Sequence, residues 1–205
     1  MSQQIKTYIQ LQVNNRDRFT VFFRAFFIIP VAIFAGSFAG GSSTNNSYNS
    51  HFSSNFYFAG VFILPVVLTL LFRGVYPSYV LQFNKAMLAL SLRIGAYFLL
   101  LTDDYPSIEA NEKIGIEFPD IQGGKTLSRG LPLVKWLLAI PLYIVGIVYG
   151  VYAIMLTVLA WFTIVITGAY PEWCADGVIG TIAYWNRVTG YAFALVTDEY
   201  PSFSL

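Results

Sequence analysis

The chain has 205 residues, of which 56% are hydrophobic and only 11% are charged, and its formal net charge at pH 7 is +1. Soluble domains carry about 25% charged residues, so this composition indicates a membrane protein, and a net charge so close to zero excludes the basic face that binds nucleic acid. One cysteine and one histidine exclude a disulfide within the chain, a cysteine zinc cluster and a metal site built from several imidazoles.

Near the amino terminus, apolar side chains and Thr7 occupy every second position, and a similar alternation occurs again after residue 113. A period of two is typical of a half-buried strand. The positions on one face are Ile5, Thr7, Ile9, Leu11 and Val13 in the first segment and Ile114, Ile116 and Phe118 in the second. We expect these two strands to pair with each other on the cytoplasmic side of a membrane.

Two apolar runs, at residues 19–35 and 56–72, follow the first strand and are separated by a polar tract. The tract, residues 36–55, is rich in Gly, Ser and Asn, and such insertions are tolerated where a chain already turns in water. We therefore expect the two runs to form a transmembrane hairpin. A secretory signal is the alternative for the first run, because three arginines precede or enter it and Ala-Gly-Ser ends it.

A third apolar stretch, residues 78–101, carries a narrow polar stripe at steps of three and four, and residues 173–196 repeat this pattern. The spacing places each stripe on one face of a helix, which is typical of an amphipathic helix lying in the membrane interface. The stripes consist of Gln82, Lys85, Ala89, Arg93 and Ala96 in the first helix and of Asp176, Gly180, Ala183, Arg187 and Gly190 in the second.

Residues 109–130 form a linker with an acidic start and two adjacent glycines. The long apolar run that follows, residues 134–167, would span about 51 Å as one helix, well beyond a hydrocarbon core of roughly 30 Å. We therefore expect a tight turn near residues 147–150, at the position equivalent to the polar insertion. This gives a second transmembrane hairpin, at residues 131–147 and 151–167.

The hexapeptide TDDYPS at residues 102–107 returns as TDEYPS at residues 197–202, and each copy ends one unit of an internal repeat. Other residues recur in the same order and with the same spacing from neighbouring motifs. The matching pairs are Arg18 with Arg129, Arg24 with Lys135, Pro30 with Pro141, Gly74 with Gly168, and Arg93 with Arg187. The sequence thus predicts a first repeat at residues 1–108, the linker at 109–130 and a second repeat at 131–205.

Lysine and arginine are absent from residues 25–72 and 136–186, so the polar insertion and the expected turn of the second hairpin carry none. Basic loops stay in the cytoplasm, so these two tips are expected outside. This favours four spans over six, in which the third stretch of each repeat would also cross. We predict an all-α integral membrane protein of two parallel repeats, related by an axis along the membrane normal, with both termini cytoplasmic.

The second repeat has a basic residue, Ile-Pro, a long apolar run, and then a fixed series of motifs. These are Trp161-Phe162, Thr167-Gly168-Ala169-Tyr170-Pro171, Arg187, Tyr191 and Thr197-Asp198-Glu199-Tyr200-Pro201. This order resembles the bacterial membrane proteins of domain-of-unknown-function family 4389. The first repeat is similar to a diverged second copy, in which Arg73 replaces the threonine before Gly74. The resemblance implies a bacterial inner membrane protein and brings no activity, substrate or catalytic residue.

Each hexapeptide has the features of a helix stop. Its aspartate lies where the apolar helix leaves the membrane, its tyrosine suits the membrane interface, and the residue before its proline disfavours helix. The alternative is that the aspartates pair across the repeats, Arg93 with Asp198 and Arg187 with Asp103, since an unpaired charge near lipid is costly. The candidate structural or head-group-binding charges are Lys85, Arg93, Asp103, Arg187 and Asp198.

No catalytic constellation is convincing, so we expect neither catalysis nor a cofactor. Cys174 has no partner histidine, and the Gly-Gly-Lys-Thr at residues 123–126 lacks the spacing of a P-loop. The sequence favours a structural or accessory subunit that contacts membrane lipid and packs against itself or another membrane protein. The alternatives are a lipid or small-solute binding or transport protein, with a basic cleft at the cytoplasmic leaflet, and a membrane enzyme.

Overall fold

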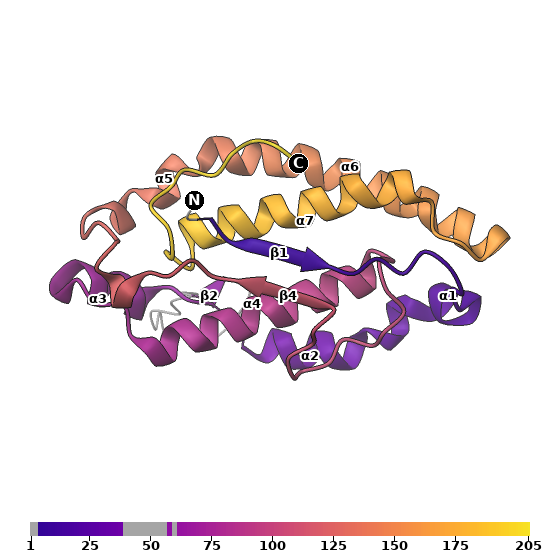
Figure 1. The fold of residues 1–205 in the computed structure, drawn as a ribbon, viewed down its shortest axis with the longest axis horizontal. Coiled ribbons are helices and arrows are strands. Elements are labelled where there is room, and N and C mark those ends of the chain that lie inside the picture. Colours follow the sequence, from indigo (N-terminus) through magenta and orange to yellow (C-terminus); the bar gives the residue numbers. More distant parts are fainter. Residues whose placement is uncertain (1–3, 39–56, 59–60) are drawn as a thin grey trace, which may run out of the picture.

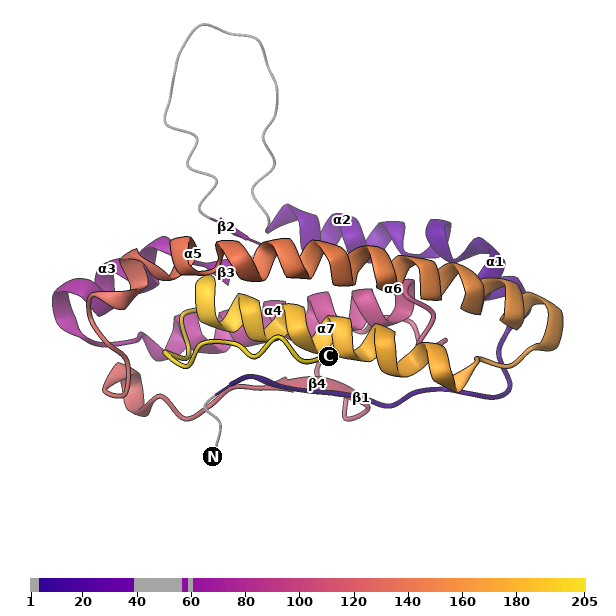
Figure 2. The ribbon, with the colours of Figure 1, turned by 90° about the horizontal axis from the view of Figure 1, so that it is seen from above.

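A computed structural model describes residues 4–38, 57–58 and 61–205, which form an elongated and mainly helical molecule (Figure 1). Figure 2 shows three layers whose long elements run along the same axis. The outer layer contains α1 (Arg18–Phe27), α2 (Ile29–Ser37), α3 (Leu64–Arg73), α5 (Lys135–Leu138) and α6 (Ile140–Thr167). The middle layer contains α4 (Ser78–Phe98) and α7 (Glu172–Ala192), and the third layer is a small sheet.

The sheet consists of the two strands that the alternating pattern predicted. β1 (Lys6–Ile9) pairs antiparallel with β4 (Ile114–Glu117), so that Lys6 lies opposite Glu117. The inner side chains of the sheet pack on the middle layer. Ile5, next to β1, contacts Gly190 of α7 so closely that a Cβ added at Gly190 would lie 2.4 Å from Cδ1 of Ile5. The prediction of a strand pair is therefore confirmed. The linker also contains a short 3₁₀ turn, η1 (Gln122–Gly124), and a second one, η2 (Leu131–Leu133), follows the linker.

The first predicted hairpin differs from the structure in its second helix, because residues 56–72 do not form one helix. Tyr57–Phe58 and Val61–Phe62 pair as the short strands β2 and β3, and α3 begins only at Leu64. Pro65 lies in the first turn of α3, where its fixed φ and missing N–H suit a helix start. Most of the predicted polar insertion, from residue 39 to residue 55, lies outside the described residues.

The predicted turn near residues 147–150 is wrong, because α6 is one continuous helix of 28 residues. A helix of this length extends about 42 Å. Gly146 allows close packing of α6 on α7, since a Cβ there would lie 2.7 Å from Cζ2 of Trp185. The second half lacks the polar insertion that separates α2 from α3, so nothing interrupts its helix. Both α6 and the apolar helical stretch Arg18–Ser37 are long enough to cross a membrane.

The two halves of the fold are related by a half-turn about an axis perpendicular to the sheet. β1 and β4 are antiparallel neighbours, and α4 and α7 have 21 residues each. In Figure 1 this axis points at the viewer, and the half-turn carries α7 onto α4, α5 onto α1, and α6 onto α2 with α3. The corresponding elements of the two halves therefore follow each other in the same order along the chain.

The halves also contact each other at the two ends of the molecule. A Cβ added at Gly74 would lie 2.7 Å from Nε of Arg129, and one added at Gly168 would lie 3.3 Å from Nη2 of Arg18. Both glycines end their helices, α3 and α6, in the left-handed conformation that favours glycine at a helix end. Arg18, the first residue of α1, and Arg129, which precedes α5, thus each pack on the helix end of the other half.

We expect Gly124→Ala to destabilise the fold, because Gly124 has a φ of +100° and a Cβ there would lie 2.7 Å from the backbone nitrogen of Tyr76. The matched control is Gly123→Ala, where φ is +68° but nothing lies within 4 Å of the added Cβ. The first substitution should lower the free energy of unfolding by about 1 to 3 kcal/mol more than the second. Denaturant unfolding in detergent measures both, and equal losses would contradict a role for the close approach.

Candidate functional site

The first half contains a buried cluster of two arginines and one aspartate. Arg24, on α1, donates to Oδ1 of Asp103 and, at 2.7 Å, to the backbone carbonyl of Tyr97. Arg16 precedes α1, and its Nη2 lies 3.1 Å from the same carboxylate oxygen. The backbone N–H of Asp17 donates to Oδ2 at 3.0 Å. Both arginine side chains are almost fully buried and the carboxylate is only 13% exposed, so this ionic cluster is shielded from solvent.

The second half contains a buried lysine and aspartate at the opposite end of the molecule. Nζ of Lys135, on α5, lies 2.6 Å from Oδ1 of Asp198 and 2.6 Å from the carbonyl of Thr197. The backbone N–H of Ser128 donates to Oδ2 of Asp198 at 2.6 Å. The lysine side chain is 1% exposed, and its Nζ lies 5.3 Å from the ring centroid of Tyr191.

These two clusters occupy equivalent positions in the two halves, when the linker from residue 109 is counted with the second half. The equivalent sets are Asp17, Arg24 and Asp103 in the first half and Ser128, Lys135 and Asp198 in the second. The threonine of each hexapeptide closes a local turn, since Thr102 and Thr197 accept from the N–H two residues later at 3.1 and 3.0 Å. The hexapeptide therefore positions an aspartate that forms an ion pair with a buried cation, and this cation lies on the first helix of the same half.

The two clusters differ in charge. Arg16 stands eight residues before Arg24, whereas the residue eight positions before Lys135 is Leu127. The first cluster therefore has two cations for one carboxylate, and the second has one of each. Buried ions are costly unless they are paired, so the additional arginine is unexplained by charge balance.

The predicted pairing of Arg93 with Asp198 is wrong. Nε and Nη2 of Arg93 donate to the backbone carbonyls of Ser107 and Ile108, at 2.9 and 3.2 Å. Ser107 is the last residue of the hexapeptide of the same half, and Ile108 follows it. This segment reaches Arg93 because it folds back beside α4.

The predicted pairing of Arg187 with Asp103 is wrong for the same reason. Arg187 donates to the backbone carbonyl of Ser204, in the carboxyl-terminal segment. Figure 1 shows the chain that follows α7 returning along this helix to the carboxyl terminus. Both arginines thus hold the chain that leaves their own helix.

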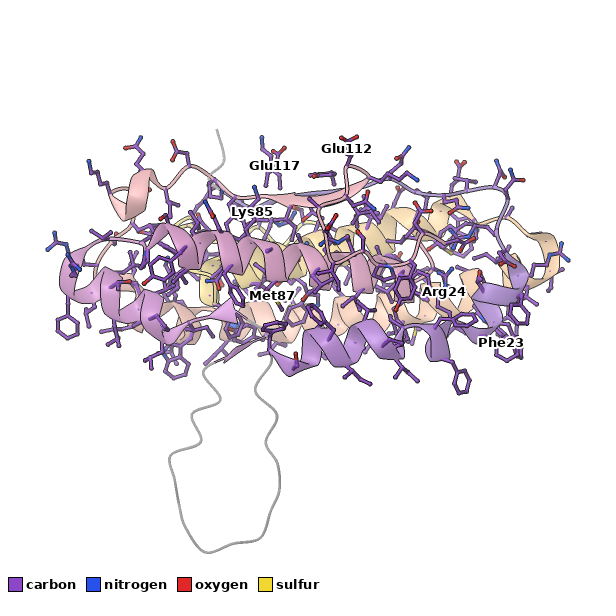
Figure 3. All side chains as sticks on the ribbon, turned by 90° about the horizontal axis from the view of Figure 1, so that it is seen from below. Phe23, Arg24, Lys85, Met87, Glu112 and Glu117 are labelled. Atoms are coloured by element: carbon purple, nitrogen blue, oxygen red, sulfur yellow. The ribbon has the colours of Figure 1, made fainter. Side chains whose placement is uncertain are left out.

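Among the other candidate charges, Lys85 is exposed on α4, and Figure 3 shows it near Glu117, on the side of the molecule away from Phe23. The cations that do pair with the aspartates, Arg16, Arg24 and Lys135, were missing from the predicted site. The recurrence of Arg24 and Lys135 six residues before a proline was the signal that could have identified two of them.

The environment of Asp198 favours its charged form. Burial alone would raise the pKa of Asp198, but hydrogen bonds from Lys135 and from the Ser128 backbone, with the charge of Lys135, hold this pKa below its ordinary value. The contribution of Asp198 to stability is therefore present above the ordinary aspartate pKa of about 3.9. It is lost as the pH falls through the lower value of the folded state.

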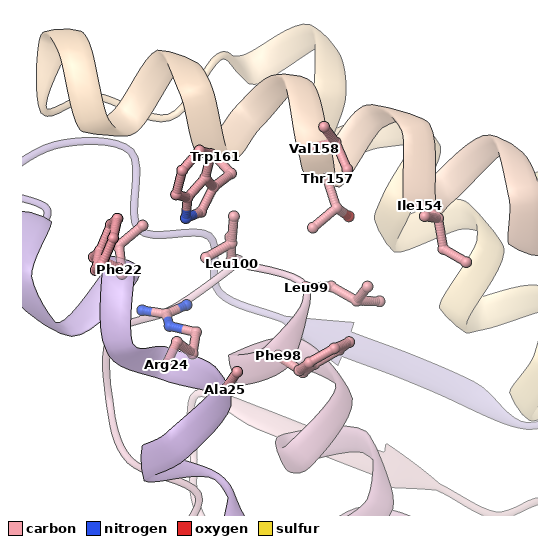
Figure 4. A pocket seen from close by; sticks show the side chains of 11 residues that line it. Phe22, Arg24, Ala25, Phe98, Leu99, Leu100, Ile154, Thr157, Val158 and Trp161 are labelled. Carbon is pink, nitrogen blue, oxygen red and sulfur yellow. The ribbon is translucent and has the colours of Figure 1, made fainter.

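An apolar cavity of about 280 Å³ lies beside the first cluster, between α1, the end of α4 and α6 (Figure 4). Small-molecule sites usually have volumes of roughly 300 to 1,000 Å³, so this cavity suits a small apolar group. Arg24 forms part of its wall and has a buried Nε without a hydrogen-bond partner. The other lining residues are Val21, Phe22, Ala25, Phe98, Leu99, Leu100, Ile154, Thr157, Val158 and Trp161.

Within the described parts of the chain, no three or more His, Cys, Asp and Glu side chains are grouped so that they could hold a metal ion. Cys174 is fully buried in α7. The arrangement provides buried ion pairs and an apolar cavity with one cationic wall. Neither feature is a nucleophile, base or acid placed against an open substrate site.

Comparisons with known proteins bear on the second half of the chain. Residues 132–204 match the model of a family described as Domain of unknown function (DUF4389), and the second copy that the sequence predicted in the first half was not found. Searches of curated proteins and of solved structures found no match. The chain carries one domain similar to this family, at residues 132–204, and the domain contains the pair of Lys135 and Asp198.

Proposed function

We propose that this chain is a non-catalytic integral membrane protein that serves as a structural or accessory subunit, in a complex with copies of itself or with another membrane protein. The observation that carries the proposal is the apolar surface of α6, where exposed side chains recur at steps of three and four along the whole helix. They are Ile144, Ile147, Val151, Met155, Val158, Phe162 and Ile166. An apolar face of this extent requires lipid or a protein partner to cover it.

The proposal includes a location in a bacterial inner membrane with both termini in the cytoplasm. It is supported by the two apolar helices and by the absence of lysine and arginine from residues 136–186. In this role the buried ion pairs stabilise each half, since each pair connects the first helix of a half to the hexapeptide at its end.

Native mass spectrometry of the protein, extracted with its surrounding lipids, tests this role. We expect either an integer multiple of the chain mass or a fixed ratio to a second membrane protein. Detection of the monomer alone would contradict the proposal.

A second candidate function, binding of a lipid or a small apolar solute, is favoured by the cavity beside Arg24. Thr157 and Thr163 allow a matched comparison, because both lie on α6 and each donates to the carbonyl four residues earlier. Only Thr157 lines the cavity. If the cavity holds a lipid chain, Thr157→Phe should remove a lipid that remains bound in the wild type and in Thr163→Phe, as measured by native mass spectrometry.

A further inference from the structure

We infer that the long helices lie parallel to the membrane plane, with the outer layer in one leaflet and the sheet in water, and that they do not cross the bilayer. This inference goes beyond the proposed function and rests on its premise that the chain resides in a membrane. According to this inference, the lipid of a single leaflet covers the apolar surface of the outer layer. Three independent features of the described residues support it.

The first feature is the position of the sheet. β1 and β4 run along the same axis as α6, with α4 and α7 between them (Figures 1 and 2). If α6 crossed the bilayer, this two-stranded sheet would stand at the depth of the hydrocarbon core. Open sheet edges do not occur in contact with hydrocarbon, because their unpaired N–H and C=O groups have no water to bond. An in-plane orientation places the sheet outside the lipid.

The second feature is the separation of charged and apolar side chains. α6 has no charged residue, while the sheet layer carries exposed charges along its length. These are Lys6, Glu112, Lys113, Glu117 and Asp120. Figure 3 shows Glu112 and Glu117 on the side opposite Phe23, which belongs to the outer layer. A molecule that is apolar on one long side and charged on the other fits a membrane surface, as an amphipathic interfacial helix does.

The third feature is the direction of the half-turn axis. Because it is perpendicular to the sheet, it is also perpendicular to the helices. Crossing helices would place the basic ends of the two halves on opposite sides of the membrane, contrary to the usual cytoplasmic location of lysine and arginine. Helices in the plane place both basic ends on one side. The two ends contain Arg16, Arg18 and Arg24 in one half and Lys125, Arg129 and Lys135 in the other.

Spin labels along α6 test the inference through their depth in the bilayer. Cysteines at Ile144, Met155 and Ile166 lie on the exposed face and span about 33 Å of helix. Collision rates with oxygen and with a water-soluble nickel complex report the depth of each label in vesicles of bacterial phospholipids. We expect similar depths, within about 10 Å of the headgroup boundary, at all three positions. The wild type serves as the blank, since Cys174 is fully buried.

A label at Glu117→Cys provides the matched control on the opposite side of the molecule. In the in-plane orientation it contacts the nickel complex freely. A profile with Met155 deepest and both ends at the headgroups, together with a lipid-embedded label at Glu117, would overturn the inference and leave the subunit role intact. Labels in water at all three α6 positions would overturn the inference and its premise of membrane residence.

Discussion

Asp103→Asn is expected to cause a large loss of stability, because it leaves both Arg16 and Arg24 without their carboxylate. Removing one partner of a buried ion pair costs about 3 to 5 kcal/mol, and here one substitution leaves two nearly fully buried cations uncompensated. The loss should therefore reach at least this range. Denaturant unfolding in detergent measures it, followed by the tyrosine and tryptophan fluorescence of the chain.

The next residue provides the control for this prediction. Asp104 also forms an ion pair, with Lys113 at 2.7 Å, but these side chains are 48% and 57% exposed. Exposed pairs contribute about 0 to 1 kcal/mol, so Asp104→Asn should have little effect. If Asp103→Asn and Asp104→Asn have the same small effect, the buried cluster does not hold the first half together.

Lys135→Met should destabilise the second half by about 3 to 5 kcal/mol, because it leaves Asp198 partly buried without its cation. Adding Asp198→Asn to Lys135→Met removes this unpaired charge, while the amide oxygen can still accept from the N–H of Ser128. Replacing a buried ion pair by neutral groups is often close to neutral. We therefore expect the double variant to be more stable than Lys135→Met, and additive losses would contradict the coupling of the two charges.

The pH dependence of stability in the single variant Asp198→Asn gives a separate check. The lowered pKa of Asp198 means that the stability from the charged aspartate is complete above about pH 4 and decreases at lower pH. The difference in stability between the wild type and Asp198→Asn should therefore be constant from about pH 5 to 7 and become smaller below pH 4. A constant difference down to pH 2 would show that the charge of Asp198 contributes nothing.

The sequence predicted those features of the fold that depend on local patterns. The alternation around Ile5 and Ile114 predicted the strand pair. The turn near residues 147–150 was predicted from bilayer thickness and from the insertion in the first half. It failed because α6 packs along α7 without interruption, and the sequence alone does not show this contact.

The charge clusters were predicted in part. Asp103 and Asp198 were identified, but Arg93 and Arg187 were assigned to them because all four lie on or just after the same two helices. The path of the chain from the last residue of each hexapeptide onward decides the outcome, since its backbone carbonyls accept hydrogen bonds from these arginines. The spacing of Arg24 and Lys135 before their prolines contained the correct information.

The contacts of Arg18 with Gly168 and of Arg129 with Gly74 have a consequence for how the chain unfolds. A polypeptide with only one of the halves would leave its arginine without the helix end on which it packs and its strand without a neighbour. Each half thus supplies packing that the other half requires, so the two halves are expected to unfold together in one cooperative transition.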